Sequence, residues 1–216
     1  MSAIVDYDHI FVDFDETLFN HYQFLNWLDD QLYKWGYLKA DKGSFKSAID
    51  DFHDMQQGNH LLRLYRHRDH VHDKTNQSWQ QLSKLVTETL NLQQLDFCYP
   101  DAHTLLKKLV SSGSEVQILT FGDDEYQRFK INTCQFMQSH HIPIQVVNET
   151  KADYLAQHYN HAKGTLIDDK HPLNLPNNWH HIWINRKVKL AEPKRLTARE
   201  IQISSLDQTI PAITMP

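Results

Sequence analysis

Cysteine and glycine are scarce in this sequence, and no long apolar run is present. Its two cysteines, Cys98 and Cys134, are too few for a disulfide framework, so we expect a reducing compartment. The six glycines form no glycine-rich loop of the kind that cradles nucleotide phosphates. No apolar run can span a bilayer, and the N-terminal MSAIVDYDH has neither the basic nor the apolar region of a signal peptide. We therefore expect a cytoplasmic protein that does not bind membranes.

A strong excess of positive charge is also missing. The formal net charge is −5 at pH 7, which argues against general binding to nucleic acids. The 15 histidines are scattered rather than placed at the spacing of metal ligands. One segment, RKVKLAEPKRLTAR at residues 186–199, is locally basic. We interpret it as a solvated surface loop, with an anion-binding patch as the alternative.

What the sequence does contain is a series of short apolar runs, most of them followed by a helical pattern. Runs without polar alternation are typical of parallel strands that are covered on both faces. In YPDAHTLLKKLVSSG, Pro100 suits an early helical position and Gly113 suits the end of a helix. The alternation predicts an α/β fold with a Rossmann-like, mostly parallel sheet flanked by helices. The predicted strands are His9–Asp13, Ser114–Thr120, Ile142–Val147, Gly164–Asp168 and His180–Asn185.

The segment from about residue 19 to residue 97 interrupts this alternation. It contains no convincing strand, and FLNWLDDQLYKWG, SFKSAIDDFHDMQQG and SWQQLSKLVTETL each place apolar residues at helical spacing. The last of these opens with Ser78 and Gln81 as a candidate capping box. We therefore predict an α/β core domain made of residues 1–18 and 98–216, and an all-helical insertion made of residues 19–97.

Acidic and other reactive side chains follow several of the predicted strands. In HIFVDFDETLFN, at residues 9–20, Asp13 and Asp15 come at the end of an apolar strand, and their i, i+2 spacing directs both side chains the same way. Burying unpaired carboxylates is costly, so a site that collects them usually holds a cation or performs chemistry. Open α/β sheets bind ligands at the carboxyl ends of their strands. The other residues expected near this edge are Thr120, Gly122, Lys151, Asp168 and Asp169.

This ordered set resembles the four motifs of the haloacid dehalogenase (HAD) superfamily of phosphohydrolases. The motifs are an apolar strand ending in Asp-x-Asp-x-Thr, a strand ending in Thr or Ser, a lysine near a helix start, and an acidic pair after an apolar strand. The matching positions are residues 13–17, Thr120, Lys151, and Asp168 with Asp169. The resemblance covers the chain apart from the insertion. In that superfamily an insertion directly after the first motif is a helical cap that closes over the site and selects the substrate, which implies such a cap at residues 19–97.

The resemblance also implies catalytic roles. Asp13 would attack phosphorus and form an aspartyl-phosphate, and Asp15 would serve as general acid and base. Thr120 and Lys151 would hold the phosphoryl oxygens, beside the flexible Gly122. Simpler alternatives remain: Thr120 as a helix-capping hydroxyl, Lys151 as a solvated helix lysine, and the two aspartates as turn residues.

The implied cofactor is Mg²⁺, which prefers a shell of hard oxygen ligands. By family resemblance the ion would bind the carboxylate of Asp13, the backbone carbonyl of Asp15 and the carboxylate of Asp168. Asp169 would hold a metal-bound water or orient Lys151. Which of Asp168 and Asp169 binds the ion directly stays open at this point.

The inserted segment contains LLRLYRHRDH, which places Arg63, His67 and His70 on one helical face, with Arg66 beside them. We include Arg63 and Arg66 as candidates for binding a second anionic group of the substrate, with a solvated charged face as the alternative. A zinc site in HRDHVHD lacks cysteine and a partner pair. A kinase-like HRD motif would need asparagine at position 74, where this chain has Lys74, and a glycine-rich loop.

Taken together, the sequence predicts a Mg²⁺-dependent phosphohydrolase that cleaves a small phosphomonoester. The alternatives are a phosphomutase or phosphotransferase of the same fold, and a non-catalytic binding or regulatory module, which is disfavoured because no motif acid is missing. The expected partner is a small phosphorylated metabolite rather than a nucleic acid or a membrane. The sequence favours no particular substrate or oligomeric state.

Overall fold

The computed structural model describes residues 7–35, 79–111, 115–134, 136–137 and 141–209. The chain divides into two compact units, one made of residues 1–19, 98–121 and 140–216, and the other of residues 20–97 and 122–139. This division places residues 122–139 with the helical segment, whereas the predicted core domain included them. The assignment of residues 19–97 as a cap stays a prediction, and the SFKSAIDDFHDMQQG pattern and Ser78 lie outside the described residues.

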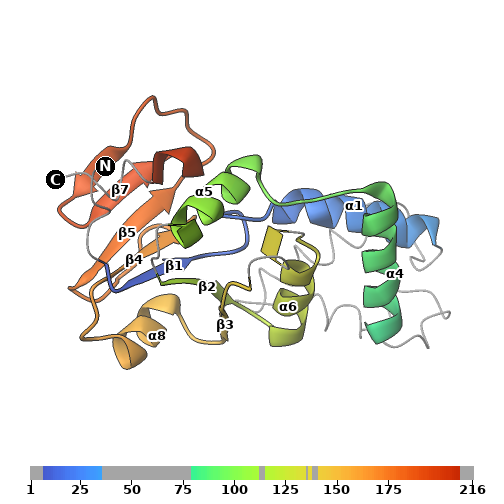
Figure 1. Ribbon diagram of the computed structural model, residues 1–216, viewed down its shortest axis with the longest axis horizontal. Helices are drawn as coiled ribbons and strands as arrows, with labels where there is room; N and C mark the ends of the chain where they lie inside the picture. Colours follow the sequence, from blue (N-terminus) through green and yellow to red (C-terminus); the bar gives the residue numbers. More distant parts are fainter. Residues whose placement is uncertain (1–6, 36–78, 112–114, 135, 138–140, 210–216) are drawn as a thin grey trace. The chain divides into compact units, whose positions relative to one another are not determined.

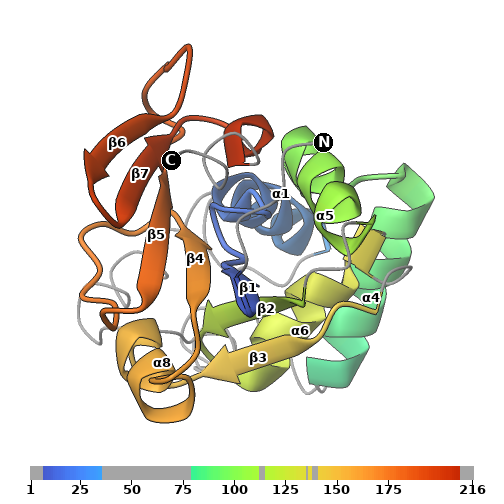
Figure 2. The ribbon, with the colours of Figure 1, turned by 60° about the vertical axis from the view of Figure 1, so that its left-hand side comes forward.

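The first unit is built on a seven-stranded sheet with strand order β3-β2-β1-β4-β5-β7-β6 (Figures 1 and 2). Neighbouring strands pair in parallel except β6, which runs antiparallel to β7. The predicted α/β class with a mostly parallel sheet is therefore confirmed. The strands are β1 His9–Val12, β2 Val116–Phe121, β3 Ile144–Val147, β4 Gly164–Asp168, β5 Trp179–Ile184, β6 Lys194–Thr197 and β7 Glu200–Ile203.

Helices cover both faces of this sheet. Helix α5, Pro100–Ser111, and helix α8, Lys151–His158, lie on opposite sides of it in both views of the ribbon (Figures 1 and 2). Thr150 caps α8, because its hydroxyl accepts a hydrogen bond from the backbone N–H of Asp153 at 3.1 Å. Covering both faces explains why the central strands are continuous apolar runs.

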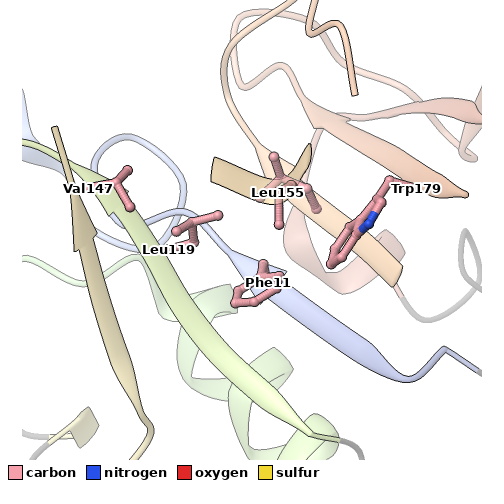
Figure 3. Packing of buried hydrophobic residues seen from close by; sticks show 6 residues of the cluster. Phe11, Leu119, Val147, Leu155 and Trp179 are labelled. Atoms are coloured by element: carbon pink, nitrogen blue, oxygen red, sulfur yellow. The ribbon is translucent and has the colours of Figure 1, made fainter. Parts of the chain in front are cut away.

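The core beneath α8 gathers side chains from five strands and the helix. Figure 3 shows Phe11 of β1 near Leu119 of β2, with Leu155 of α8 and Trp179 of β5 close by. The ring of Phe11 lies 5.5 Å from the indole of Trp179. This cluster fixes β1, β2 and β4 as neighbours, and the candidate site lies where these strands end. Its buried members are Phe11, Leu119, Val147, Leu155, Leu166 and Trp179.

Gly164 is required where β4 passes the indole of Trp179. A Cβ atom at this position would lie 2.4 Å from two ring atoms of Trp179, which is fully buried and cannot move aside. We expect Gly164→Ala to lower the free energy of unfolding by on the order of 3 kcal/mol. Thermal unfolding should then shift downward by about 6–12 °C.

A double mutant tests whether the indole ring is the cause of that loss. Trp179→Leu removes the two ring atoms that the new methyl group would meet, so Gly164→Ala should cost much less in that background. If the losses in the free energy of unfolding from the two substitutions simply add in the double mutant, the steric explanation is wrong.

The second unit contains helices α1 His21–Lys34, α4 Trp79–Gln93 and α6 Asp124–Asn132. Phe24 packs edge-on against Phe97 at 5.5 Å, and the indole N–H of Trp27 donates to the Gln93 side chain at 3.1 Å. Among the described helices, none combines the length and apolarity that a membrane crossing requires.

Helix α6 ends at Asn132, where the Thr133 hydroxyl and backbone N–H both donate to the Lys130 carbonyl and tighten the last turn. One expectation about local structure is wrong. The basic segment at residues 186–199 is not simply a loop. It contains β6, a largely exposed edge strand whose charged residues hide the strand pattern.

Candidate active site

Asp13 is the first residue after β1, the strand that lies between β2 and β4. Its backbone N–H donates to the carbonyl of Ile167 in β4 at 2.9 Å, so the sheet fixes its main chain. The side chain is 5% exposed, and Oδ2 accepts a long hydrogen bond of 3.4 Å from the Thr17 hydroxyl. A buried carboxylate thus lies at the carboxyl edge of the sheet.

Lys151 meets this carboxylate from the first turn of α8. Its Nζ lies 2.5 Å from Oδ1 of Asp13 and 2.6 Å from Oδ2 of Asp168. The lysine is buried, so the alternative of a solvated helix lysine is wrong. A cation in a first helical turn is opposed by the helix dipole. Here the two carboxylates supply the compensating negative charge.

Asp168 ends β4 beside Asp13, and Asp169 follows it. Asp168 is fully buried, and its Oδ1 accepts a hydrogen bond from the backbone N–H of Lys170 at 2.7 Å. The Oδ2 of Asp169 pairs with the Lys170 ammonium at 3.1 Å. The Oδ1 of Asp169 is buried and has no hydrogen-bond partner in the described part of the chain.

The donor set of this cluster suits a divalent cation. Asp13, Asp168 and Asp169 each offer a carboxylate oxygen, and these oxygens lie within 4.8 Å of one another. Three carboxylates face two ammonium groups, the buried one of Lys151 and the exposed one of Lys170, so the cluster carries excess negative charge. Hard oxygen ligands and an unpartnered buried oxygen fit Mg²⁺, and both Asp168 and Asp169 lie within reach of such an ion.

The protonation equilibria reflect this crowding. Burial raises the pKa of Asp13 well above its usual range, an effect that Lys151 opposes and the neighbouring carboxylates strengthen. Burial also raises the pKa of Asp169, against the pull of Lys170. For Lys151, burial favours the neutral amine, but Asp13 and Asp168 outweigh it and hold its pKa above the ordinary value. The cluster therefore binds protons tightly when no metal offsets its charge.

The remaining predicted site residues are less closely joined to this cluster. Thr120 lies near the end of β2, next to β1, and is buried. Asp15 is half-buried in the turn that follows Asp13. Gly122 has a φ of 150° and belongs to the second unit. Arg63 and Arg66 lie outside the described residues.

Sequence reasoning missed two residues that shape the site. Trp183 of β5 donates its indole N–H to the carbonyl of Asp169 at 3.1 Å and so holds the loop after β4. Arg186, assigned to the solvated loop, instead reaches the turn after Asp13 and donates to the backbone carbonyls of Glu16 and Thr17. A weak signal for Arg186 is its place two residues after an apolar strand, where the chain is still close to the carboxyl edge of the sheet.

No family model matches the sequence, and no curated protein matches it. Solved structures do. A protein named as a haloacid dehalogenase-like hydrolase from Burkholderia xenovorans LB400 has a TM-score of 0.62 and 15% identity, covering 98% of this chain and 100% of its own. The HAD-hydrolase YfnB from Bacillus subtilis, bound to magnesium, has a TM-score of 0.55 and 13% identity, with coverages of 97% and 99%.

CbbY from Rhodobacter sphaeroides, in complex with phosphate, has a TM-score of 0.53 and 13% identity, covering 93% of this chain and 95% of its own. Identities of this size establish the fold rather than the activity. The motif resemblance and the structural neighbours agree on that fold. This chain has the fold of the haloacid dehalogenase-like hydrolases.

Proposed function

We propose that this chain is a Mg²⁺-dependent phosphohydrolase that cleaves a small phosphomonoester through an aspartyl-phosphate on Asp13. The observation that carries the proposal is the meeting of three carboxylates and one buried ammonium group at the carboxyl edge of the sheet. A phosphoryl group brings further negative charge to a carboxylate nucleophile, so cations must offset the repulsion. Neighbours of the same fold bound to magnesium and to phosphate support the proposal.

The carboxylates of Asp13 and Asp168 and the backbone carbonyl of Asp15 would hold the ion, with Asp169 binding it directly or through a water. Bound Mg²⁺ would supply the positive charge that stabilises the phosphoryl oxygens and keeps Asp13 ionised. The unpartnered Oδ1 of Asp169 supports this assignment, because a buried carboxylate oxygen without a donor is costly.

The chain's own residues would then carry the chemistry in two steps. An oxygen of Asp13 bonds to phosphorus while the bond to the ester oxygen breaks, and Asp15 donates a proton to the departing oxygen. Asp15, now ionised, accepts a proton from a water whose oxygen bonds to phosphorus, and the bond from phosphorus to Asp13 breaks. Inorganic phosphate leaves, and both aspartates return to their starting states.

Lys151 and Thr120 would position the phosphoryl group. The Lys151 ammonium has three N–H groups and spends two on Asp13 and Asp168, which leaves one for a phosphoryl oxygen. Thr120 is buried near the end of β2, the strand next to β1, and its hydroxyl would serve as a second donor. An acid at position 15 favours phosphoryl transfer over dehalogenation, since HAD members without that acid are often not phosphatases.

Metal dependence is the first test. The purified protein should release phosphate from 4-nitrophenyl phosphate with Mg²⁺, lose this activity in EDTA, and regain it when Mg²⁺ is added in excess. Mg²⁺ at about 100 times its Kd should also stabilise the fold by about 2.7 kcal/mol, seen as a rise in Tm. Phosphate release that is equally fast in EDTA would refute the proposal, and chloride release from a chloroacid in place of phosphate release would favour a dehalogenase.

A further inference from the structure

The turn that follows Asp13 is held by a residue from the far end of the first unit. Arg186, two residues after β5, donates from one guanidinium nitrogen to the carbonyl of Thr17 at 2.7 Å, and from Nε to the carbonyl of Glu16 at 3.3 Å. These contacts span about 170 positions of sequence and lie entirely within one compact unit. A single side chain therefore fixes two successive peptide carbonyls next to Asp15.

The turn needs such support because its backbone is strained. Glu16 has a φ of 57°, in the left-handed region that side chains other than glycine rarely adopt. Its backbone N–H donates to the carbonyl of Phe19 at 2.7 Å, and the carbonyl of Phe14 accepts from the N–H groups of Leu18 and Phe19 at 2.9 Å. Asp15 lies between the anchored Phe14 and the strained Glu16, so its direction depends on this closed turn.

Arg186 is itself rigidly mounted. Two of its nitrogens donate to the two carboxylate oxygens of Asp101 at 3.0 and 3.1 Å, and its guanidinium carbon lies 3.6 Å from the centre of the Tyr99 ring. Burial opposes ionisation of Asp101, yet hydrogen bonds from Arg186 and from the backbone N–H of Leu206 hold its pKa below the ordinary value. Asp101 therefore stays ionised and holds the guanidinium group of Arg186 in place.

Tyr99 adds a second link to the same turn. Its hydroxyl donates to Oε2 of Glu16 at 2.9 Å, and burial together with the Glu16 carboxylate raises the pKa of Tyr99, which keeps the phenol protonated. Its backbone N–H donates to the carbonyl of Leu18 at 2.8 Å. Arg186 and Tyr99 thus hold the turn by hydrogen bonds to Glu16, Thr17 and Leu18.

We propose that Arg186 is a positioning residue that fixes the turn at residues 14–19, so that Asp15 faces the leaving oxygen and Thr17 faces Asp13. The inference rests on the proposed phosphohydrolase function and adds a residue to it. The planar guanidinium donates at once to both carboxylate oxygens of Asp101 and to the carbonyls of Glu16 and Thr17. A lysine ammonium group cannot match that geometry. We therefore expect the kcat/KM of Arg186→Lys to be nearly as low as that of Arg186→Met.

The test compares leaving groups, because positioning of the acid matters most for a poor one. The value of kcat/KM reports steps up to the departure of the alcohol, and a general acid contributes about 10²–10⁴-fold when the alcohol leaves poorly. We expect Arg186→Met to lower kcat/KM for an alkyl phosphate by at least about tenfold more than for 4-nitrophenyl phosphate. The matched control is Lys187→Met, at the neighbouring exposed position, which should leave both values unchanged.

Hydrogen exchange of the backbone amides provides a readout that does not depend on catalysis. Arg186→Met should speed exchange at residues 16–19, where three N–H groups are bonded inside the turn, and leave the strand amides of β1 as slow as in the wild type. Equal losses of kcat/KM for the two esters, or unchanged exchange in the turn, would overturn this inference alone. A wild-type protein that hydrolyses neither ester would overturn the proposed function and this inference with it.

Discussion

Asp13→Asn is expected to abolish phosphate release, lowering kcat by at least about 10⁴-fold, as the loss of a catalytic nucleophile does in other enzymes. The amide cannot bond to phosphorus as a carboxylate does, so no aspartyl-phosphate forms. The measurement is release of phosphate from 4-nitrophenyl phosphate, together with intact mass after rapid acid quench, in which only the wild type should gain a phosphoryl group.

This loss should come from chemistry and not from unfolding. Asp13 is one of three clustered carboxylates that outnumber the neighbouring ammonium groups of Lys151 and Lys170, so removing its charge relieves repulsion in the metal-free protein. We expect Asp13→Asn to keep or raise Tm in EDTA and to lose much of the stabilisation by Mg²⁺. The control Asp207→Asn makes the same change at an exposed position and should alter neither property. Phosphate release within tenfold of the wild type would show that Asp13 is not the nucleophile.

Lys151→Met is expected to cost both activity and stability. Removing one partner of a buried ion pair typically costs about 3–5 kcal/mol, because the remaining charge stays buried and unpaired. Here Asp13 and Asp168 would both lose their cation. The measurement is chemical unfolding at pH 7 in EDTA, with the exposed Lys108→Met as the matched control.

The stability deficit of Lys151→Met should depend on pH in a defined direction. The pKa of Lys151 is raised in the folded protein, so its stabilising charge is fully present at pH 7 and is lost only as the pH rises through that raised pKa. The pKa of Asp13 is raised as well, and loss of the opposing Lys151 charge raises it further, so the variant gains more stability than the wild type as the pH falls toward the ordinary carboxyl range. Acidification from pH 7 should therefore reduce the difference in the free energy of unfolding between the variant and the wild type, and so should Mg²⁺. A gap that widens on acidification would contradict this account.

The meeting of Asp13, Lys151 and the Asp168–Asp169 pair could be predicted because it follows from topology. Parallel strands end at one edge of their sheet, so apolar runs that finish in polar groups bring those groups together without further information. The same logic located β1 to β5 within a few residues. The alternation of apolar strands and helical patterns was enough to predict the α/β class and the mostly parallel sheet.

The failures have a different physical origin. Edge strand β6 has solvent on one side, so its charged residues carry no apolar pattern to mark it. The role of Arg186 depends on partners 85 and 170 positions away, and its place after an apolar strand separates it only weakly from the exposed Lys187 beside it. Arginines of this kind are defined by their tertiary contacts alone.

The charged character of β6 bears on how copies of this chain meet. β6 is the outermost strand on its side of the sheet, with Lys194 and Arg195 exposed along it. Two copies that approached each other through this strand would bring like cations face to face, at a separation shorter than the Debye length of about 8 Å at physiological ionic strength. Pairing of two copies through their β6 strands is therefore unfavourable at low ionic strength. We expect such pairing to occur first at high salt.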